Sequence, residues 1–143
     1  MMDRLNTRNL LRRKNLKIQN NDYSYVTCRQ CVEETAMHLF FKCSFSTSCW
    51  DWLGIHWQVH LNFFDMILEA KHQFQHQFFF EIIIIACWHI WKQRNDKIFE
   101  RKVPFIDDWR RKFKDECRLQ SCRFKDQEKD QFLLWLDSLY LGL

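Results

Sequence analysis

Three cysteines and one histidine lie close together in the first third of the chain, in the pattern Cys-x2-Cys-x6-His-x4-Cys. These residues are Cys28, Cys31, His38 and Cys43. Thiolate and imidazole groups are ligands that Zn²⁺ prefers, and four of them complete a tetrahedral shell with no open position for water. Such a closed site stabilises a fold and does not activate a substrate. The pattern therefore predicts a structural zinc ion held by a small knuckle and a helix.

The rest of the chain is expected to be helical, because residues that form tight turns are scarce. Its 143 residues include two glycines and one proline, whereas an all-β fold needs many turns. We therefore predict a mainly α fold, with a small zinc-knuckle and helix module followed by a long helix and a C-terminal helical extension. The predicted domains are a zinc-binding domain, truncated at its N-terminus, over residues 1–75 and the helical extension over residues 76–143.

Hydrophobic periodicity predicts several helices after the zinc ligands. The most apolar segment, residues 78–91, is too short for a membrane span, which needs about 20 apolar residues. A helical pattern continues beyond this segment, and Pro104 then interrupts the chain. The predicted helices run from residue 44 or 46 to about 53, over 63–69, over about 76–100, and over 105–140 as a helical hairpin or one broken helix.

Aromatic residues are more abundant than a chain of this size is expected to bury. The sequence contains fourteen Phe, seven Trp and three Tyr. We therefore expect exposed apolar helices that bind a protein partner, and a homo-oligomer is a further way to cover such a surface. The candidate partner-binding residues are Trp88, Trp91, Trp109, Phe113, Leu133, Trp135 and Leu136.

The N-terminal segment, residues 1–21, is basic, with six Arg or Lys residues against one Asp. It fits an amphipathic helix beside the metal site, a helix that contacts nucleic-acid phosphates, or an Arg-rich mitochondrial presequence. No secretory signal is found, so the nucleus or cytoplasm is expected, with the mitochondrion as the alternative. The candidate nucleic-acid contacts are Arg8, Arg12, Arg13, Lys14 and Lys17.

No catalytic constellation is found in the sequence, and we expect the protein not to be an enzyme. Residues 105–108 match the aromatic-x-Asp-Asp motif of polymerase palms, which needs a third carboxylate on a sheet to hold two magnesium ions. Asp107 and Asp108 instead follow a proline, and we interpret them as acidic residues at a helix start. Cys87 and His89 lie in an apolar segment, where thiols are usually inert.

Two segments carry a resemblance to a known family. The first contains Leu5-Asn6-Thr7, then the four metal ligands with Glu33-Glu34-Thr35 between them, and then Cys49-Trp50. It resembles the zinc-binding domain that lies downstream of the reverse transcriptase in plant LINE-type, non-LTR retrotransposons. The second segment, residues 88–95, resembles the Trp-x2-Trp-Lys-x-Arg-Asn sequence found further downstream in the same elements.

This resemblance implies that the Cys3His set binds zinc and that the domain works with nucleic acid beside a polymerase. The proline and glycine that usually follow the first two cysteines are replaced here by Arg29 and Val32. Because the polymerase and endonuclease are absent, we expect a domesticated fragment of a transposable element that cannot transpose by itself. Its expected function is that of a regulatory factor that acts by protein interaction. The alternative is a nucleic-acid-binding zinc module that uses the basic N-terminal helix.

Overall fold

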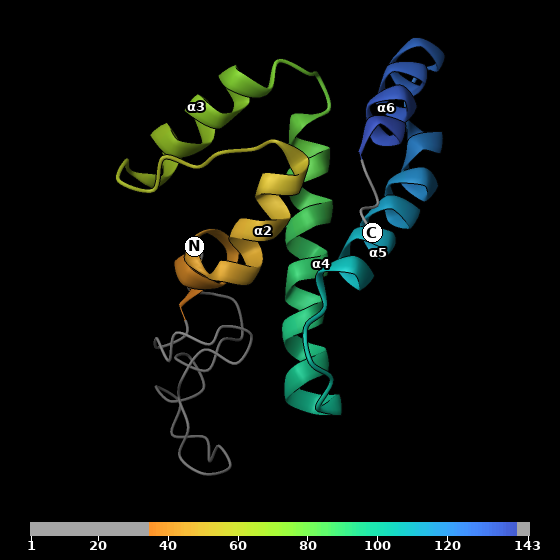
Figure 1. Ribbon diagram of the computed structural model, residues 1–143. Helices are drawn as coiled ribbons and strands as arrows, with labels where there is room; N and C mark the ends of the chain where they lie inside the picture. Colours follow the sequence, from red (N-terminus) through yellow and green to blue (C-terminus); the bar gives the residue numbers. More distant parts are fainter. Residues whose placement is uncertain (1–34, 140–143) are drawn as a thin grey trace. The chain divides into compact units, whose positions relative to one another are not determined.

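The computed structural model describes residues 35–139 of the chain (Figure 1). This part is mainly helical, and no β-strand occurs within it. The prediction of a mainly α fold is therefore confirmed. The predicted zinc knuckle is not covered, because Cys28 and Cys31 lie outside the described residues, as does the predicted N-terminal helix.

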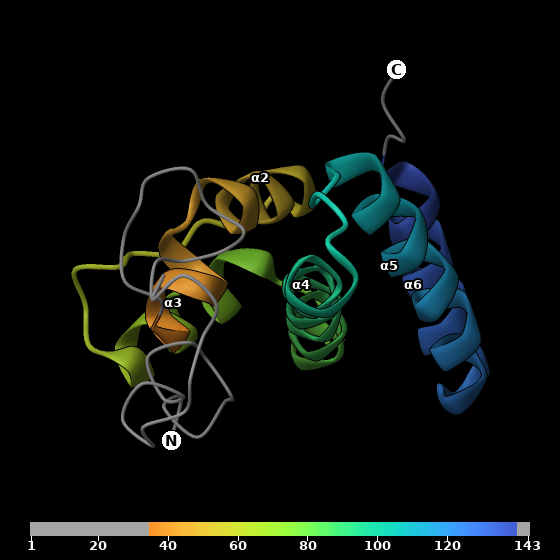
Figure 2. The same ribbon diagram turned by 90° about the horizontal axis from the view of Figure 1, so that it is seen from below.

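The helices confirm most of the elements that periodicity predicts. The long helix expected over residues 76–100 is α4, and the C-terminal hairpin consists of α5 and α6, which lie side by side in Figures 1 and 2. Gly54 ends α2 with a φ of 74°, a left-handed conformation that glycine adopts without strain. The elements are the π-helix η3 (His38–Lys42), α2 (Ser44–Leu53), α3 (Phe63–Phe74), α4 (Phe79–Glu100), α5 (Ile106–Gln120), the 3-10 helix η4 (Ser121–Arg123) and α6 (Asp126–Ser138).

The chain forms two compact units. Within the described part, the first unit contains residues 35–47 and 90–104, and the second contains residues 48–89 and 105–139. This division differs from the predicted boundary between residues 75 and 76, because the two halves of α4 belong to different units.

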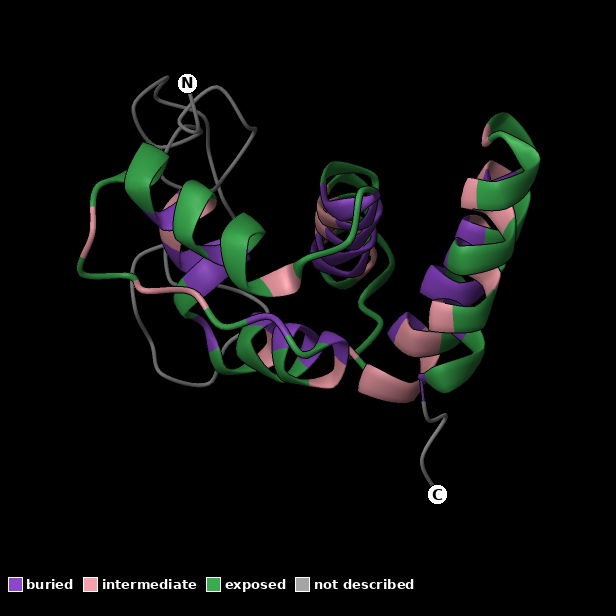
Figure 3. Cartoon of the chain, turned by 90° about the horizontal axis from the view of Figure 1, so that it is seen from above, coloured by how far each residue is buried: buried purple, intermediate pink, exposed green. Residues whose placement is uncertain are grey.

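Aromatic side chains form the core of the second unit. The rings of Phe78 and Phe132 meet edge to face with their centroids 5.0 Å apart, which joins the start of α4 to α6. On α5, Trp109 and Phe113 stack at 5.2 Å, and the ring of Trp52 from α2 lies 5.9 Å from each of them. Figure 3 shows the buried residues of the α5–α6 hairpin gathered on one side and the exposed residues on the other.

Candidate functional site

Two of the four predicted zinc ligands lie at η3: His38 is its first residue, and Cys43 is the C-cap residue that follows Lys42. The backbone N–H of Cys43 donates a hydrogen bond of 2.9 Å to the carbonyl oxygen of His38. This bond from residue i to i+5 defines a π-helix, a rare form that is frequent at functional sites. In an α-helix, residues five apart point about 140° away from each other. The wider π-turn brings the two positions towards the same side.

The surroundings of His38 and Cys43 suit metal ligands. His38 is 7% exposed and Cys43 is fully buried. The backbone N–H of His38 donates to the hydroxyl oxygen of Thr35, which caps the start of the segment. Burial, with a smaller contribution from the charge of Lys42, lowers the pKa of His38 and so favours the neutral imidazole that binds metals. Both residues therefore fit a zinc site in their chemistry.

The other two predicted ligands, Cys28 and Cys31, lie outside the described residues. Within residues 35–139, no group of three or more His, Cys, Asp or Glu side chains is arranged to hold a metal ion. Two of the four predicted ligands fall within this range. The complete Cys3His site stays a prediction. The basic candidates Arg8, Arg12, Arg13, Lys14 and Lys17 also lie outside the described part of the chain.

The predicted partner-binding residues are split between the core and the surface. Trp109, Phe113 and Leu136 have no exposed surface, so a partner cannot reach them in this fold. They form the buried stripes of α5 and α6, where apolar residues recur at helical spacing. Trp88, in contrast, is 53% exposed. Three further candidates have intermediate exposure: Trp91, Leu133 and Trp135.

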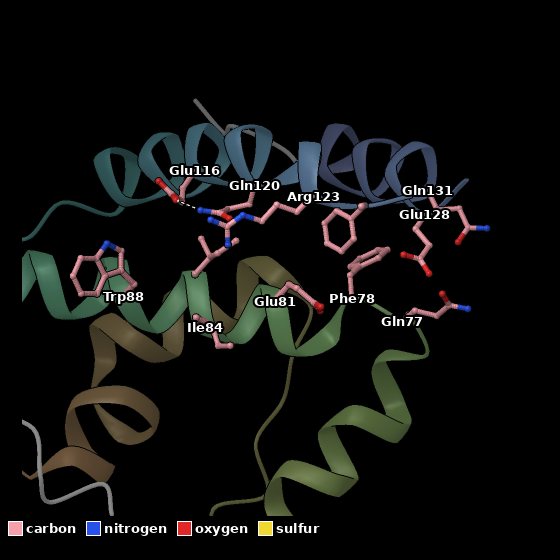
Figure 4. A pocket seen from close by; sticks show the side chains of 12 residues that line it. Gln77, Phe78, Glu81, Ile84, Trp88, Glu116, Gln120, Arg123, Glu128 and Gln131 are labelled. Atoms are coloured by element: carbon pink, nitrogen blue, oxygen red, sulfur yellow. Dashed lines mark hydrogen bonds between the residues drawn. The ribbon is translucent and has the colours of Figure 1, made fainter. Parts of the chain in front are cut away.

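A groove of about 740 Å³ lies within the second unit, between α4 and the α5–α6 hairpin (Figure 4). Its floor is apolar. Phe78 and Ile85 are buried there, whereas Ile84 and Trp88 are 68% and 53% exposed. In Figure 4, Trp88 lies at one end of the groove and Phe78 lies towards the other. Glu81 lies between Phe78 and Ile84 along α4 (Figure 4), so the groove presents apolar side chains on either side of a carboxylate.

Carboxylates surround this apolar floor. Glu81 comes from α4, Glu116 from α5 and Glu128 from α6, and Arg123 is the single Lys or Arg among the lining residues. Glu116 accepts a hydrogen bond of 2.7 Å from the side-chain amide of Gln120 (Figure 4). Neither Glu81 nor Glu128 forms an ion pair with another described residue. The groove therefore combines apolar side chains with an excess of acidic ones.

The sequence alone did not reveal these acidic residues as one group, because they come from three different helices. The one local signal is Glu81, which interrupts the most apolar segment of the chain. A carboxylate at such a position is expected to reach the surface, since burying its charge is costly. The helix beside it then has an exposed side that carries both apolar and acidic groups.

The remaining candidates for catalysis have structural explanations. Asp107 and Asp108 lie in the first turn of α5 and pair with Arg110 at 3.1 Å and Lys112 at 2.9 Å. This confirms that they are helix-start acids. Burial raises the pKa of the Cys87 thiol to about 12, so the nucleophilic thiolate is scarce at neutral pH.

Comparisons with protein-family models, curated proteins and solved structures give no match for this chain. Among the described residues, no helix is both long and apolar enough to cross a membrane. Two features of the described residues bear on function: the positions of His38 and Cys43 at η3, and the acidic groove of the second unit.

Proposed function

We propose that this protein is a non-catalytic zinc-binding module that acts as a regulatory factor by binding a protein partner. The groove of the second unit carries this proposal. Ile84 and Trp88 are large apolar side chains that remain exposed side by side along α4, one helical turn apart. Contiguous apolar surface of this kind is typical of interaction sites, and tryptophan is frequent among residues that dominate binding energy.

Zinc has a structural role in this proposal. His38 and Cys43 would supply two ligands, and Cys28 and Cys31 the other two. A bound zinc ion would cross-link the segment of residues 28–43 and stabilise it. The motifs around these ligands support an origin in the zinc-binding domain of a plant LINE-type element, with the interaction function acquired by the fragment.

Metal analysis of the purified full chain tests the zinc site. We expect stoichiometric zinc in the wild type and its loss in Cys28→Ser and Cys43→Ser. Cys122→Ser is the matched control, because Cys122 is an exposed thiol on η4 outside the ligand set. A wild type that is folded and free of zinc after purification in zinc-containing buffer would contradict the metal site.

Affinity purification of the tagged full chain from cells tests the interaction function. The double variant Ile84→Ala and Trp88→Ala should lose a partner that the wild type retains. Leu134→Ala is the control, since Leu134 is 72% exposed on α6 and does not line the groove. Full retention of all specific partners by the double variant would contradict the proposed function.

A second candidate function is nucleic-acid binding through residues 1–21. The excess of Arg and Lys in this segment favours it, because such residues neutralise phosphates and release counterions. Charge reversal at Arg12 and Arg13 should then weaken retention on single- or double-stranded nucleic acid and reduce its dependence on salt. Unchanged retention would exclude this function.

A further inference from the structure

We propose that the groove between α4 and the α5–α6 hairpin binds a basic amphipathic helix of the partner protein. The inference rests on the proposed interaction function and specifies the chemistry of the ligand. It follows from three properties of the groove: its length, the apolar strip along its floor, and the sign of the charge around it.

The length of the groove matches a short helix. Its floor follows α4 from Phe78 to Trp88, which corresponds to about 15 Å at the α-helical rise per residue. A docked helix of about three turns covers this distance. Helix-in-groove recognition uses apolar side chains at spacings of three, four and seven residues, and three turns supply such a set.

The floor offers contacts from both sides of the groove. Ile84 and Trp88 project from α4, and Phe124 lies at the end of η4 on the hairpin side. Phe78 is buried towards the other end of the groove from Trp88 (Figure 4), with its ring 5.0 Å from that of Phe132. The packed pair Phe78 and Phe132 anchors this end of the groove, and a surface held in place by packing costs a ligand less binding energy in reorganisation.

The charges around the floor select a basic ligand. Glu81, Glu116 and Glu128 outweigh the single cation Arg123. Lys or Arg side chains on the polar side of a docked helix would therefore meet carboxylates on both walls. Nucleic acid is disfavoured here, because its phosphates would face these carboxylates.

The net charge of the whole chain makes this preference informative. The full sequence carries a formal charge of +4, so non-specific attraction favours acidic peptides. A preference for a basic peptide must therefore arise from a local acidic site. The groove is such a site within the described residues.

Peptide binding to the full chain, followed by fluorescence anisotropy, tests the inference. The probe is a labelled Leu–Lys peptide of about 14 residues with leucines at helical spacing, and its control has Glu at every Lys position. We expect the Leu–Lys peptide to bind and the Leu–Glu peptide to bind at least about tenfold more weakly. Higher salt should reduce the difference.

Groove variants connect this binding to particular residues. Glu81→Gln combined with Glu128→Gln should weaken binding of the Leu–Lys peptide about three- to tenfold. Trp88→Ala should weaken it about tenfold or more. Asp130→Asn is the matched control, because Asp130 is exposed on α6 near Glu128 but does not line the groove. Circular dichroism should show the same helix content in every variant.

The outcomes separate the two proposals. If both peptides bind equally and Trp88→Ala weakens both, the interaction function stands but the preference for a basic helix is overturned. If Trp88→Ala changes neither, the groove is not the binding site. Sedimentation tests a second copy as the occupant: self-association that is lost in Trp88→Ala, without peptide binding, would also overturn the inference.

Discussion

Helices α4 and α5 both line the groove, but their apolar side chains are distributed differently. On α5, Trp109 and Phe113 lie four residues apart and are fully buried, and charged residues cover the other sides. On the first half of α4, Ile82 is buried, whereas Ile84 and Trp88 are exposed on another side. The apolar stripe of α5 is thus buried in the core of the folded chain. The exposed residues Ile84 and Trp88 of α4 are the basis of the proposed partner surface.

The largest expected difference between the two helices concerns their tryptophans. Trp109→Ala should lower the free energy of unfolding by about 3–5 kcal/mol, because it leaves a cavity in the aromatic core. Trp88→Ala should lower it by less than about 1 kcal/mol, since the side chain is already half in solvent. Urea denaturation measures both values. Equal losses in the free energy of unfolding would show that Trp88 belongs to the core and is not an exposed residue of the groove.

Substitution of a buried lysine on α5 is expected to have the next largest effect on the free energy of unfolding. The Nζ atom of Lys114 donates a hydrogen bond of 3.0 Å to the carbonyl oxygen of Leu139, which ties α5 to the end of α6. Lys114→Ala should cost about 1–3 kcal/mol, because a buried carbonyl loses its partner and a gap remains. The control Lys112→Ala removes only a surface ion pair with Asp108 and should cost less than about 1 kcal/mol. Thermal unfolding of the two variants compares them directly, and a smaller loss for Lys114→Ala would contradict the role of this tie.

The dependence of stability on pH tests burial along α4. Burial raises the pKa of Cys87 from 9.0 to about 12. Between these pH values, the thiol stays protonated in the folded state and is deprotonated in the unfolded state. The contribution of this thiol is complete below pH 9 and is lost as the pH rises from 9 towards 12. Between pH 8 and pH 10, the wild type should lose about 1 kcal/mol more stability than Cys87→Ala. Burial also raises the pKa of Cys117 on α5, so Cys117→Ala should flatten the same curve. Identical pH curves for Cys87→Ala and the wild type would show that the thiol of Cys87 is solvated.

The smallest expected effect on stability belongs to Ile84. Ile84→Gln should change the free energy of unfolding by less than about 0.5 kcal/mol, because the side chain is 68% exposed. The same substitution should weaken binding of the Leu–Lys peptide. This separation of binding from stability is the clearest mark of an interaction surface. A loss of stability above about 2 kcal/mol would place Ile84 in the core.

Periodicity was sufficient to predict the helices but not their packing. Residues 78–91 and the pattern that follows them indicated α4, and Gly54 indicated the end of α2. The same pattern could not tell which aromatic residues face the core, so Trp109 and Trp88 were both predicted to bind a partner. The acidic character of the groove was not predicted, because Glu81, Glu116 and Glu128 are far apart in the sequence and line one groove only in the folded chain. The π-helical form of η3 was not predicted, because apolar spacing does not reveal the widening of a single turn.

The π-turn between His38 and Cys43 has a consequence for the spacing of metal ligands. A π-turn accommodates one residue more than an α-turn, so a His-x4-Cys pair in η3 occupies positions similar to those of a His-x3-Cys pair in an α-helix. Deletion of the exposed residue Lys42 should let the segment close into an α-helix with the imidazole and the thiol still on one side. The number of residues between these two ligands is thus set by the type of helix. A one-residue deletion at this point is therefore expected to keep the two ligands together.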